Sequence, residues 1–293
     1  FSRCVRCRPV AWLALLALCL SSLACKGEPR PAAAKEAMRV VSLSPSTTEV
    51  LFAVGAGDKL VGRSQQCDYP VDARRLPSVG GFADPNVEAV LGLRPSLVVG
   101  ARGPAGPQLQ RRLHEHGIAT FFPPATSVRA VGDLIVTLGE KVGRGAAALE
   151  VRRQMDDRVA ELTGWVATKS PVRVVMVFDH RPIYVAGPVG FVSELLALAG
   201  GHNVVQKGGS YPALPIERLL TLDPDVIIDA VTPGDTKPGP SALAKVAGWS
   251  ELRAVKEGRL RRLRSSTPLR PGPRLAEGLA ELVRVVHGRE PPR

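Results

Sequence analysis

Aromatic residues are scarce in this chain of 293 residues, since Phe, Trp and Tyr together make up only 4%. Proteins that bind nucleic acid combine a basic groove with aromatic side chains on which the bases stack. The formal net charge is +12, but Lys and Arg are spread along the chain. We therefore expect no nucleic-acid partner. The one dense basic stretch, Arg259–Arg264, alternates with leucine and predicts a strand with a solvated face; attraction to an anionic lipid or ligand is the alternative.

Cysteine is also sparse where the fold is expected. Of the five cysteines, Cys4, Cys7 and Cys19 lie near the N-terminus and Cys25 follows a short apolar run, which leaves Cys67 alone in the body. A body with one cysteine has no internal disulfide. Its stability must come from a hydrophobic core.

Hydrophobic runs long enough to span a membrane are absent. The longest candidate, Val10–Leu20, follows three arginines and is shorter than a membrane span, so the pattern is typical of an export signal. The small residues Ser21–Ala24 resemble a lipobox, in which Cys25 would be acylated and become the N-terminus. Cleavage there removes three arginines and no acid, so the net charge of +12 becomes +9.

Composition divides the chain into five parts. We expect a signal peptide that ends in the lipobox cysteine (1–25), a linker rich in Pro, Ala, Lys and Glu (26–37), an N-terminal lobe (38–126), connecting helices (127–168) and a C-terminal lobe (169–293). The expected lobes are of ordinary size for a domain with its own core.

One segment occurs twice. Glu88 begins a short amphipathic pattern that ends at Pro95 and leads into apolar residues, and Glu217 does the same with Pro224. In both copies proline follows seven positions after the glutamate, where it ends a helix, and the apolar run predicts a buried parallel strand. Two such copies indicate two similar α/β lobes, each with one glutamate in an equivalent place. The alternative is that helix, proline and strand recur in any α/β protein.

The remaining patterns support an α/β fold. Apolar strands are predicted at Arg39–Leu43, Leu60–Arg63 and Val172–Phe178, and Ser44 precedes Pro45 as an N-cap would precede the first helical residue. Arg144–Trp165 predicts a helix of about 30 Å that would connect the lobes stiffly. We therefore expect two lobes with parallel sheets joined by a long, rigid α-helix.

Motifs of catalysis and metal binding are missing. The chain has no nucleophile elbow, no P-loop and no zinc-ligand spacing. His114 and His116 lie two positions apart in a predicted helix, which directs them to different faces. No catalytic residue, metal site or resident cofactor is expected.

Several motifs together resemble a known family. They are Val41–Glu49, Cys67–Pro70, Val79–Phe82, the two glutamate segments and Arg270–Arg274. Their order resembles that of the periplasmic binding proteins of ABC importers for cobalamin, haem and ferric siderophores, over Arg39–His287. The resemblance implies two Rossmann-like lobes and a rigid connecting helix. It also implies a ligand in the cleft between the lobes, a periplasmic location and an ABC permease dimer, with its ATPase, as partner.

The resemblance gives the repeated glutamates a role. In the family, the residues matching Glu88 and Glu217 project from the two lobes and engage arginines of the two permease subunits. An exposed ion pair contributes roughly 0.2–1 kcal/mol, so two such pairs would mainly fix orientation. The alternative is that each glutamate only stabilises the start of its helix.

The resemblance also names candidates for the cleft. Phe82, Tyr184 and Tyr211 match aromatic residues that contact a corrin ring in cobalamin-binding members, and apolar walls suit a flat macrocycle. The cobalamin pattern commonly has tryptophan at the positions of Phe82 and Tyr211, and tyrosine at Gln66. The expected ligand is a metal chelate that the protein captures without chemistry, cobalamin or a related corrinoid first of all.

Haem or a ferric siderophore is the alternative within the same class. Haem would take an axial ligand, for which His180, Tyr184 and Tyr211 are candidates. Arg63, Arg102 and Arg270 would pair with carboxylates of an anionic chelate or with acids of the protein itself.

Two other classes remain open. One is a chelatase-like enzyme that inserts metal into a tetrapyrrole, with His180 as metal or proton handler. Export argues against it, because chelatases work where tetrapyrroles are made. The other is a scaffold that binds only protein.

Overall fold

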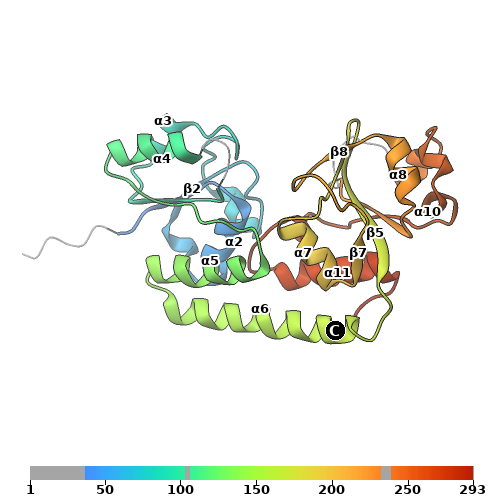
Figure 1. The fold of residues 1–293 in the computed structure, drawn as a ribbon. Helices are drawn as coiled ribbons and strands as arrows, with labels where there is room; N and C mark the ends of the chain where they lie inside the picture. The colour runs from blue at the N-terminus through green and yellow to red at the C-terminus, as the bar shows by residue number, and fades with distance from the viewer. Residues whose placement is uncertain (1–36, 103–105, 232–238, 293) are drawn as a thin grey trace, which may run out of the picture. The chain divides into compact units, whose positions relative to one another are not determined.

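Each expected lobe contains a sheet with helices packed against it, in a computed structural model that describes residues 37–102, 106–231 and 239–292 (Figure 1). Met38–Arg293 forms one unit, separate from the segment that precedes it. The predicted signal peptide, Cys25 and most of the predicted linker lie outside the described residues. No helix of the described part is both long enough and apolar enough to cross a bilayer.

The N-terminal sheet has four strands in the order β2-β1-β3-β4, and all neighbours are parallel. Its central strands are fully buried, as the apolar sequence of parallel strands predicts. The helices of this lobe include one that begins at Pro45 with Ser44 as N-cap, as expected. The elements are β1 Val40–Ser42, α2 Pro45–Ala53, β2 Leu60–Arg63, α3 Val87–Gly92, β3 Leu97–Val99, α4 Gly106–Glu115 and β4 Ala119–Phe121.

The C-terminal sheet is mixed, whereas the sequence predicted a parallel sheet. Strands β10, β9, β5 and β7 pair in parallel, but β6 runs antiparallel to β5 and to β8. The antiparallel part arises because β5 turns back at Arg181–Pro182 into β6, and a two-residue connection joins only antiparallel strands. The elements are β5 Val172–His180, β6 Ile183–Val185, α7 Phe191–Leu198, β7 Gly201–Asn203, β8 Ala213–Leu214, α8 Ile216–Leu222, β9 Val226–Asp229, α9 Pro240–Leu243, α10 Arg253–Lys256, β10 Leu260–Arg262 and α11 Leu275–His287.

Two helices connect the lobes, α5 (Val128–Lys141) and α6 (Gly145–Val166). At 1.5 Å per residue, the 22 residues of α6 extend about 33 Å. Helix α6 packs against α5 and against α11 of the C-terminal lobe, so one continuous helix runs along both lobes (Figure 1). The predicted helical connection is confirmed.

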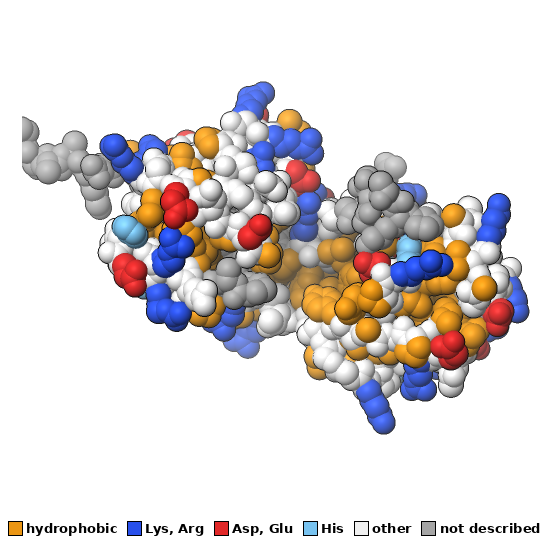
Figure 2. Space-filling view, turned by 90° about the horizontal axis from the view of Figure 1, so that it is seen from above, with side chains coloured by type: hydrophobic (Ala, Val, Ile, Leu, Met, Phe, Trp, Pro, Cys, Tyr) orange, Lys and Arg blue, Asp and Glu red, His pale blue; other side chains and the backbone are white. Residues whose placement is uncertain are grey.

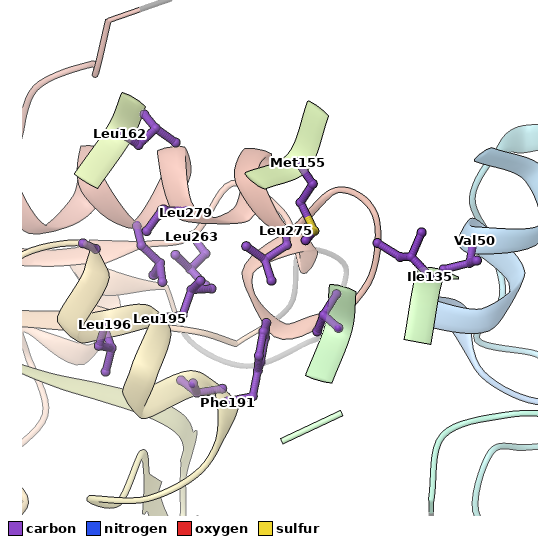
Figure 3. Packing of buried hydrophobic residues seen from close by; sticks show 14 of the residues in the cluster. Val50, Ile135, Met155, Leu162, Phe191, Leu195, Leu196, Leu263, Leu275 and Leu279 are labelled. Atoms are coloured by element: carbon purple, nitrogen blue, oxygen red, sulfur yellow. The ribbon is translucent and has the colours of Figure 1, made fainter. Parts of the chain in front are cut away.

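One hydrophobic cluster continues from lobe to lobe. It joins Val50 of α2, Ile135 of α5, Met155 of α6, Leu195 of α7 and Leu279 of α11 (Figure 3). Close-packed side chains resist sliding because any shift opens voids. The core therefore couples the two lobes through the connecting helices.

The basic strand differs from its prediction. Within Arg259–Arg264, residues Leu260–Arg262 form the parallel strand β10, but its two arginines are not simply solvated. Arg262 contacts the buried carboxylate of Asp229 at 2.6 Å, and Arg261 donates to the carbonyls of Val285 and Val286 at the end of α11. Arg262 thus pairs with an acid of the neighbouring strand. Arg261 joins β10 to α11, because carbonyls at a helix end are free to accept such donors.

Candidate functional site

The two glutamate segments are structurally equivalent. Each begins with a short helix, α3 or α8, and ends at a residue with positive φ before proline, Arg94 at 45° and Asp223 at 41°. These are the only residues other than glycine with positive φ in the described ranges. That conformation is uncommon for side chains with a Cβ, so its occurrence at matching positions is specific evidence of a repeat.

Each segment is fixed by an arginine at the start of its lobe. Arg39 donates to the carbonyl of Leu93 at 2.8 Å, and Arg173 donates to the matching carbonyl of Leu222 at 2.7 Å. The backbone N–H of each arginine also donates to a side chain just after the proline, Ser96 Oγ for Arg39 and Asp225 Oδ2 for Arg173. The sequence carries this signal, because Arg-Val-Val begins both lobes at 39–41 and 173–175.

Both glutamates are available to a partner. Glu88 and Glu217 occupy the second position of α3 and α8, and both are exposed. Helices α3 and α8 lie on the side of their lobes away from α6 (Figure 1). Glu88 forms an exposed pair with Arg112 at 3.2 Å, which contributes little stability. Because both glutamates are exposed, packing in the core does not account for their matching positions. A contact with a partner at the surface fits these positions better.

Two predicted cleft residues of the N-terminal lobe come together. The side-chain oxygen of Gln66 accepts the backbone N–H of Phe82 at 3.0 Å. This bond joins the loop after β2 to the glycine turn before α3. Loops that follow the carboxyl ends of parallel strands are where open α/β sheets bind ligands. Gln66 is exposed and Phe82 is partly buried, so both are accessible there.

An aromatic surface forms on the C-terminal lobe. Tyr211 packs edge-on against Phe178, with ring centroids 5.2 Å apart, and Tyr184 of β6 pairs with Ala213 of β8 two residues beyond Tyr211. Tyr184 and Tyr211 remain 42% and 59% exposed, which leaves their rings free for a ligand. Tyr184 therefore lies in β6, and Tyr211 lies in the segment that leads into the neighbouring strand β8.

Phe178 was missed by the sequence reasoning, which placed it in a buried strand. The pairing of β5 with β6 shifts between Val177 and Asp179, which leaves Phe178 as an extra residue in the ladder. Such a β-bulge redirects a side chain, often beside a functional site. The antiparallel partner strand causes the bulge, and the run Val172–Phe178 by itself contains no signal for it.

The surface is hollowed between the two lobes, and apolar side chains of the C-terminal lobe border the hollow (Figure 2). Ligand sites of this kind are concave and mostly apolar. The lobe arrangement thus supplies the cleft that the sequence predicted.

His180 is placed less favourably for ligation. Its side chain is 6% exposed, its Nε2 lies 3.1 Å from Asp229 Oδ1, and its ring packs edge-on against Trp249. Its Nδ1 is buried without a hydrogen-bond partner. A cavity of about 430 Å³ borders His180, Pro215 and Trp249 on this lobe. Serving as an axial ligand would require His180 to move out of a buried position.

Arg63 stabilises its own loop. Its guanidinium donates to the carbonyls of Ser64, Gln65 and Arg74. This arrangement shapes the loop that carries Gln66. Arg102 is exposed.

Arg270 belongs to an ion cluster that joins the lobes. From the segment before α11, Arg270 contacts Glu49 at 3.3 Å and Asp68 at 2.6 Å, and Arg274 contacts Glu49 at 2.8 Å. The Arg274 guanidinium also stacks on the ring of Tyr69, 3.7 Å from its centre. Burial opposes the charge of both arginines, but hydrogen bonds and charge pairing with the acids outweigh it, so their pKa values rise.

In the sequence, Glu49 is the last residue of the motif Val41–Glu49. The structure gives it a role, since its side chain is only 2% exposed and receives both arginines. Two guanidinium groups and two carboxylates leave this ion cluster (Glu49, Asp68, Arg270 and Arg274) electrically balanced.

A larger cavity lies beside the ion cluster. It measures about 690 Å³ and is lined by residues of α2, α6 and α11 together with Tyr69 and Pro70. None of the predicted cleft residues lines it. In the described ranges, no group of three or more His, Cys, Asp and Glu is placed to hold a metal ion.

The fold and this site define a class of protein. Residues 40–267 match the family model described as periplasmic binding protein, and the chain belongs to that family. Its members are solute receptors of transport systems rather than enzymes, and they act with an ABC permease from the periplasm. The chelatase alternative is therefore wrong.

Particular relatives are similar over most of the chain. A cobalamin-binding protein of Halobacterium salinarum is 34% identical over 261 residues, which cover 86% of this chain and 70% of the relative. A vitamin B12-binding protein of Yersinia pseudotuberculosis is 32% identical over 196 residues, covering 67% of this chain and 70% of the relative.

Solved structures share the fold. The periplasmic vitamin B12 binding protein BtuF of Vibrio cholerae superposes with a TM-score of 0.73 at 26% identity, covering 85% of this chain and 96% of that one. A periplasmic heme binding protein from Pseudomonas aeruginosa superposes with a TM-score of 0.78 at 28% identity, covering 87% and 95%. The predicted fold class and family are confirmed.

Proposed function

We propose that this protein captures a corrinoid, most of all cobalamin, in the cleft between its lobes and delivers it to an ABC permease. The observation that supports the proposal is the exposed aromatic surface of Phe178, Tyr184 and Tyr211 on the C-terminal lobe, in a chain whose relatives are named as cobalamin-binding proteins. Flat, largely apolar faces of this kind suit a macrocycle. Phe82 and Gln66 would contact it from the other lobe.

Haem is the second candidate, because haem-binding proteins are among the solved structures that superpose well. Tyr184 and Tyr211 are exposed and would offer phenolic oxygens to iron. Buried His180 supports haem less well.

Titration of the purified protein with cyanocobalamin, haemin and a ferric siderophore, followed by absorbance, tests the ligand. We expect saturable, stoichiometric binding of cyanocobalamin that is tighter than binding of the other two. Tighter binding of haemin would support the second candidate, and failure to bind any of them would overturn the class of ligand.

We further propose that Glu88 and Glu217 dock the two lobes onto the two permease subunits. The ATPase of the permease would lie on the far side of the membrane. Their equivalent positions and exposure support this. A cell that carries Glu88→Ala with Glu217→Ala should lose corrinoid uptake, while the purified variant keeps its affinity. Glu115→Ala with Glu251→Ala removes one exposed glutamate from each lobe elsewhere and serves as the matched control. Normal uptake by the first pair would refute the docking role.

A lipid at Cys25 would hold the protein at the membrane, with 26–37 as tether. The small residues before Cys25 support this part of the proposal. Cys25→Ala should move the protein from the membrane fraction to the soluble fraction, and an unchanged membrane fraction would contradict the anchor.

A further inference from the structure

The two carboxylates of the ion cluster differ in their exposure to solvent. Asp68 keeps 43% of its side chain exposed and Arg270 keeps 17%, whereas Glu49 keeps 2%. The same nitrogen of Arg270, Nη1, contacts both carboxylates, Asp68 at 2.6 Å and Glu49 at 3.3 Å. Asp68 is therefore the member of the pair that a ligand group can reach and replace.

Asp68 lies beside the predicted ligand surface. Gln66, two residues before it, binds the backbone of Phe82, and Tyr69, directly after it, stacks on Arg274. The loop that presents Asp68 follows the carboxyl end of β2, on the edge of the sheet where ligands bind.

Asp68 is charged at neutral pH. The hydrogen bond from Arg270, and then the charges of Arg270 and Arg74, hold the pKa of this carboxyl below its ordinary value, against the opposing effect of burial. Arg270 therefore contacts an ionised Asp68, and also Glu49, before any ligand arrives.

The neighbouring cations are also engaged. Arg274 is held by Glu49, and the guanidinium of Arg63 donates to three loop carbonyls. A carboxylate of a ligand would have to displace Asp68 from Arg270 and would then lie near the displaced negative charge. An amide of a ligand would meet no such repulsion, because it carries no charge.

We propose that Asp68 sets the charge preference of the cleft, by occupying Arg270 so that an uncharged, amide-bearing corrinoid is accepted in preference to a dianionic haem. This inference rests on the proposed function, since it assumes that the cleft takes a metal macrocycle. Asp68 discriminates by repelling the wrong ligand, not by attracting the right one.

The test compares Asp68→Asn with the wild type on three probes: cyanocobalamin, haemin and haemin dimethyl ester, which lacks the two free carboxylates. The asparagine keeps the size of the side chain and removes its charge. The ratio of haemin affinity to cyanocobalamin affinity should rise by roughly 1.5-fold to fivefold, the range expected for one partly exposed charge pair. The ratio for the dimethyl ester should stay near that of the wild type.

Asp72→Asn is the matched control. Asp72 lies in the same loop and pairs with Arg75 at 3.0 Å, with both side chains mostly exposed. This variant loses the same charge without touching Arg270, so its affinity ratios should equal those of the wild type. An equal rise in Asp72→Asn would reduce the effect to general electrostatics and overturn the role of Asp68.

Further outcomes separate this inference from the proposed function. A wild type that binds no macrocycle refutes the proposed function. A wild type that binds one, together with an Asp68→Asn variant whose ratio is unchanged or rises equally for the ester, refutes the role of Asp68 alone. Asp68→Glu keeps the charge and should retain the wild-type ratios. Should Asp68→Asn fail to fold, Asp68→Ser removes the same charge and is judged by the same ratios.

Discussion

At the scale of single residues, Glu49 is a buried carboxylate that depends on its charged partners. It is buried, and its carboxylate is the shared partner of Arg270 and Arg274. Removing one partner of a buried ion pair leaves the others uncompensated, which costs about 3–5 kcal/mol. We expect Glu49→Ala to lower the free energy of unfolding by about 3 kcal/mol or more, measured by urea denaturation.

Glu150→Ala is the control for this measurement. Glu150 lies on the exposed face of α6 and pairs with Arg153 at 2.7 Å. Surface pairs on a helix contribute little, so this variant should unfold like the wild type. Equal stability of the Glu49 and Glu150 variants would show that the ion cluster does not stabilise the fold.

Residues also show where sequence reasoning ends. The motif Ser44–Glu49 predicts the N-cap and the start of α2 correctly, because capping is decided by neighbours in the chain. It cannot reveal that Glu49 binds Arg270 and Arg274, more than 200 positions away. Arg270 was a candidate for the cleft from its motif, but its acidic partners come from the fold. Phe178 was missed because the bulge that redirects it depends on the pairing of β5 with β6, which the fold determines.

At the scale of elements, the two capping arginines should act alike. Arg39 and Arg173 donate to the carbonyls of Leu93 and Leu222, at the ends of α3 and α8. Loss of such a hydrogen bond typically costs about 1 kcal/mol. Arg39→Ala and Arg173→Ala should each lower stability by about that amount, and hydrogen exchange should quicken in the adjacent helix only.

A matched change at Arg144 provides the comparison. Arg144 precedes α6 and its side chain makes no cap bond in the described structure. Arg144→Ala should leave exchange in α3 and α8 unchanged. If only one of the two capping variants accelerates exchange, the two segments are not functionally equivalent repeats.

We expect the docking of α11 on the connecting helix to depend on pH. His287 of α11 donates to the carbonyl of Ala199 and packs edge-on against Trp165 of α6. Burial, together with nearby Lys169, Arg261 and Arg289, lowers the pKa of His287, although the bond to Ala199 opposes this. The unfolded chain therefore takes up a proton at higher pH than the folded chain.

The sign of the effect follows from this difference. Stability from neutral His287 is fully present above the ordinary histidine pKa and is lost as the pH falls below it. The urea midpoint should thus decline between about pH 7 and pH 5, and His287→Gln should flatten that decline. His202→Gln, at an exposed position, should keep the wild-type slope. An unchanged slope in His287→Gln would contradict this role.

Elements were the most predictable level of this fold. The two glutamate helices and the connecting helix follow from apolar periodicity and proline positions. The antiparallel strands β6 and β8 did not, because short strands carry weak periodicity and their direction depends on how the chain turns back after β5. Because the direction of β6 was not predicted, the sequence indicated Tyr184 and Tyr211 of the aromatic surface but not Phe178.

At the scale of the whole molecule, the lobes are joined in two ways. The hydrophobic cluster continues through α5, α6 and α11, and the ion cluster joins Glu49 and Asp68 of one lobe to Arg270 and Arg274 of the other. Closure about a hinge would have to shift packed side chains and break buried ion pairs. We therefore expect a cleft that is already formed before the ligand binds.

Small-angle scattering measures this directly. The radius of gyration of the wild type should be the same, within error, with and without saturating cyanocobalamin. Arg274→Ala removes the contacts to Glu49 and the stacking on Tyr69, so the free variant should be larger than the wild type and contract when ligand is added. Arg153→Ala, which removes an exposed arginine from α6, should behave as the wild type does. A wild type that contracts as much as Arg274→Ala would mean that the hydrophobic cluster and the ion cluster do not fix the lobes. The lobes would then close around the ligand during capture.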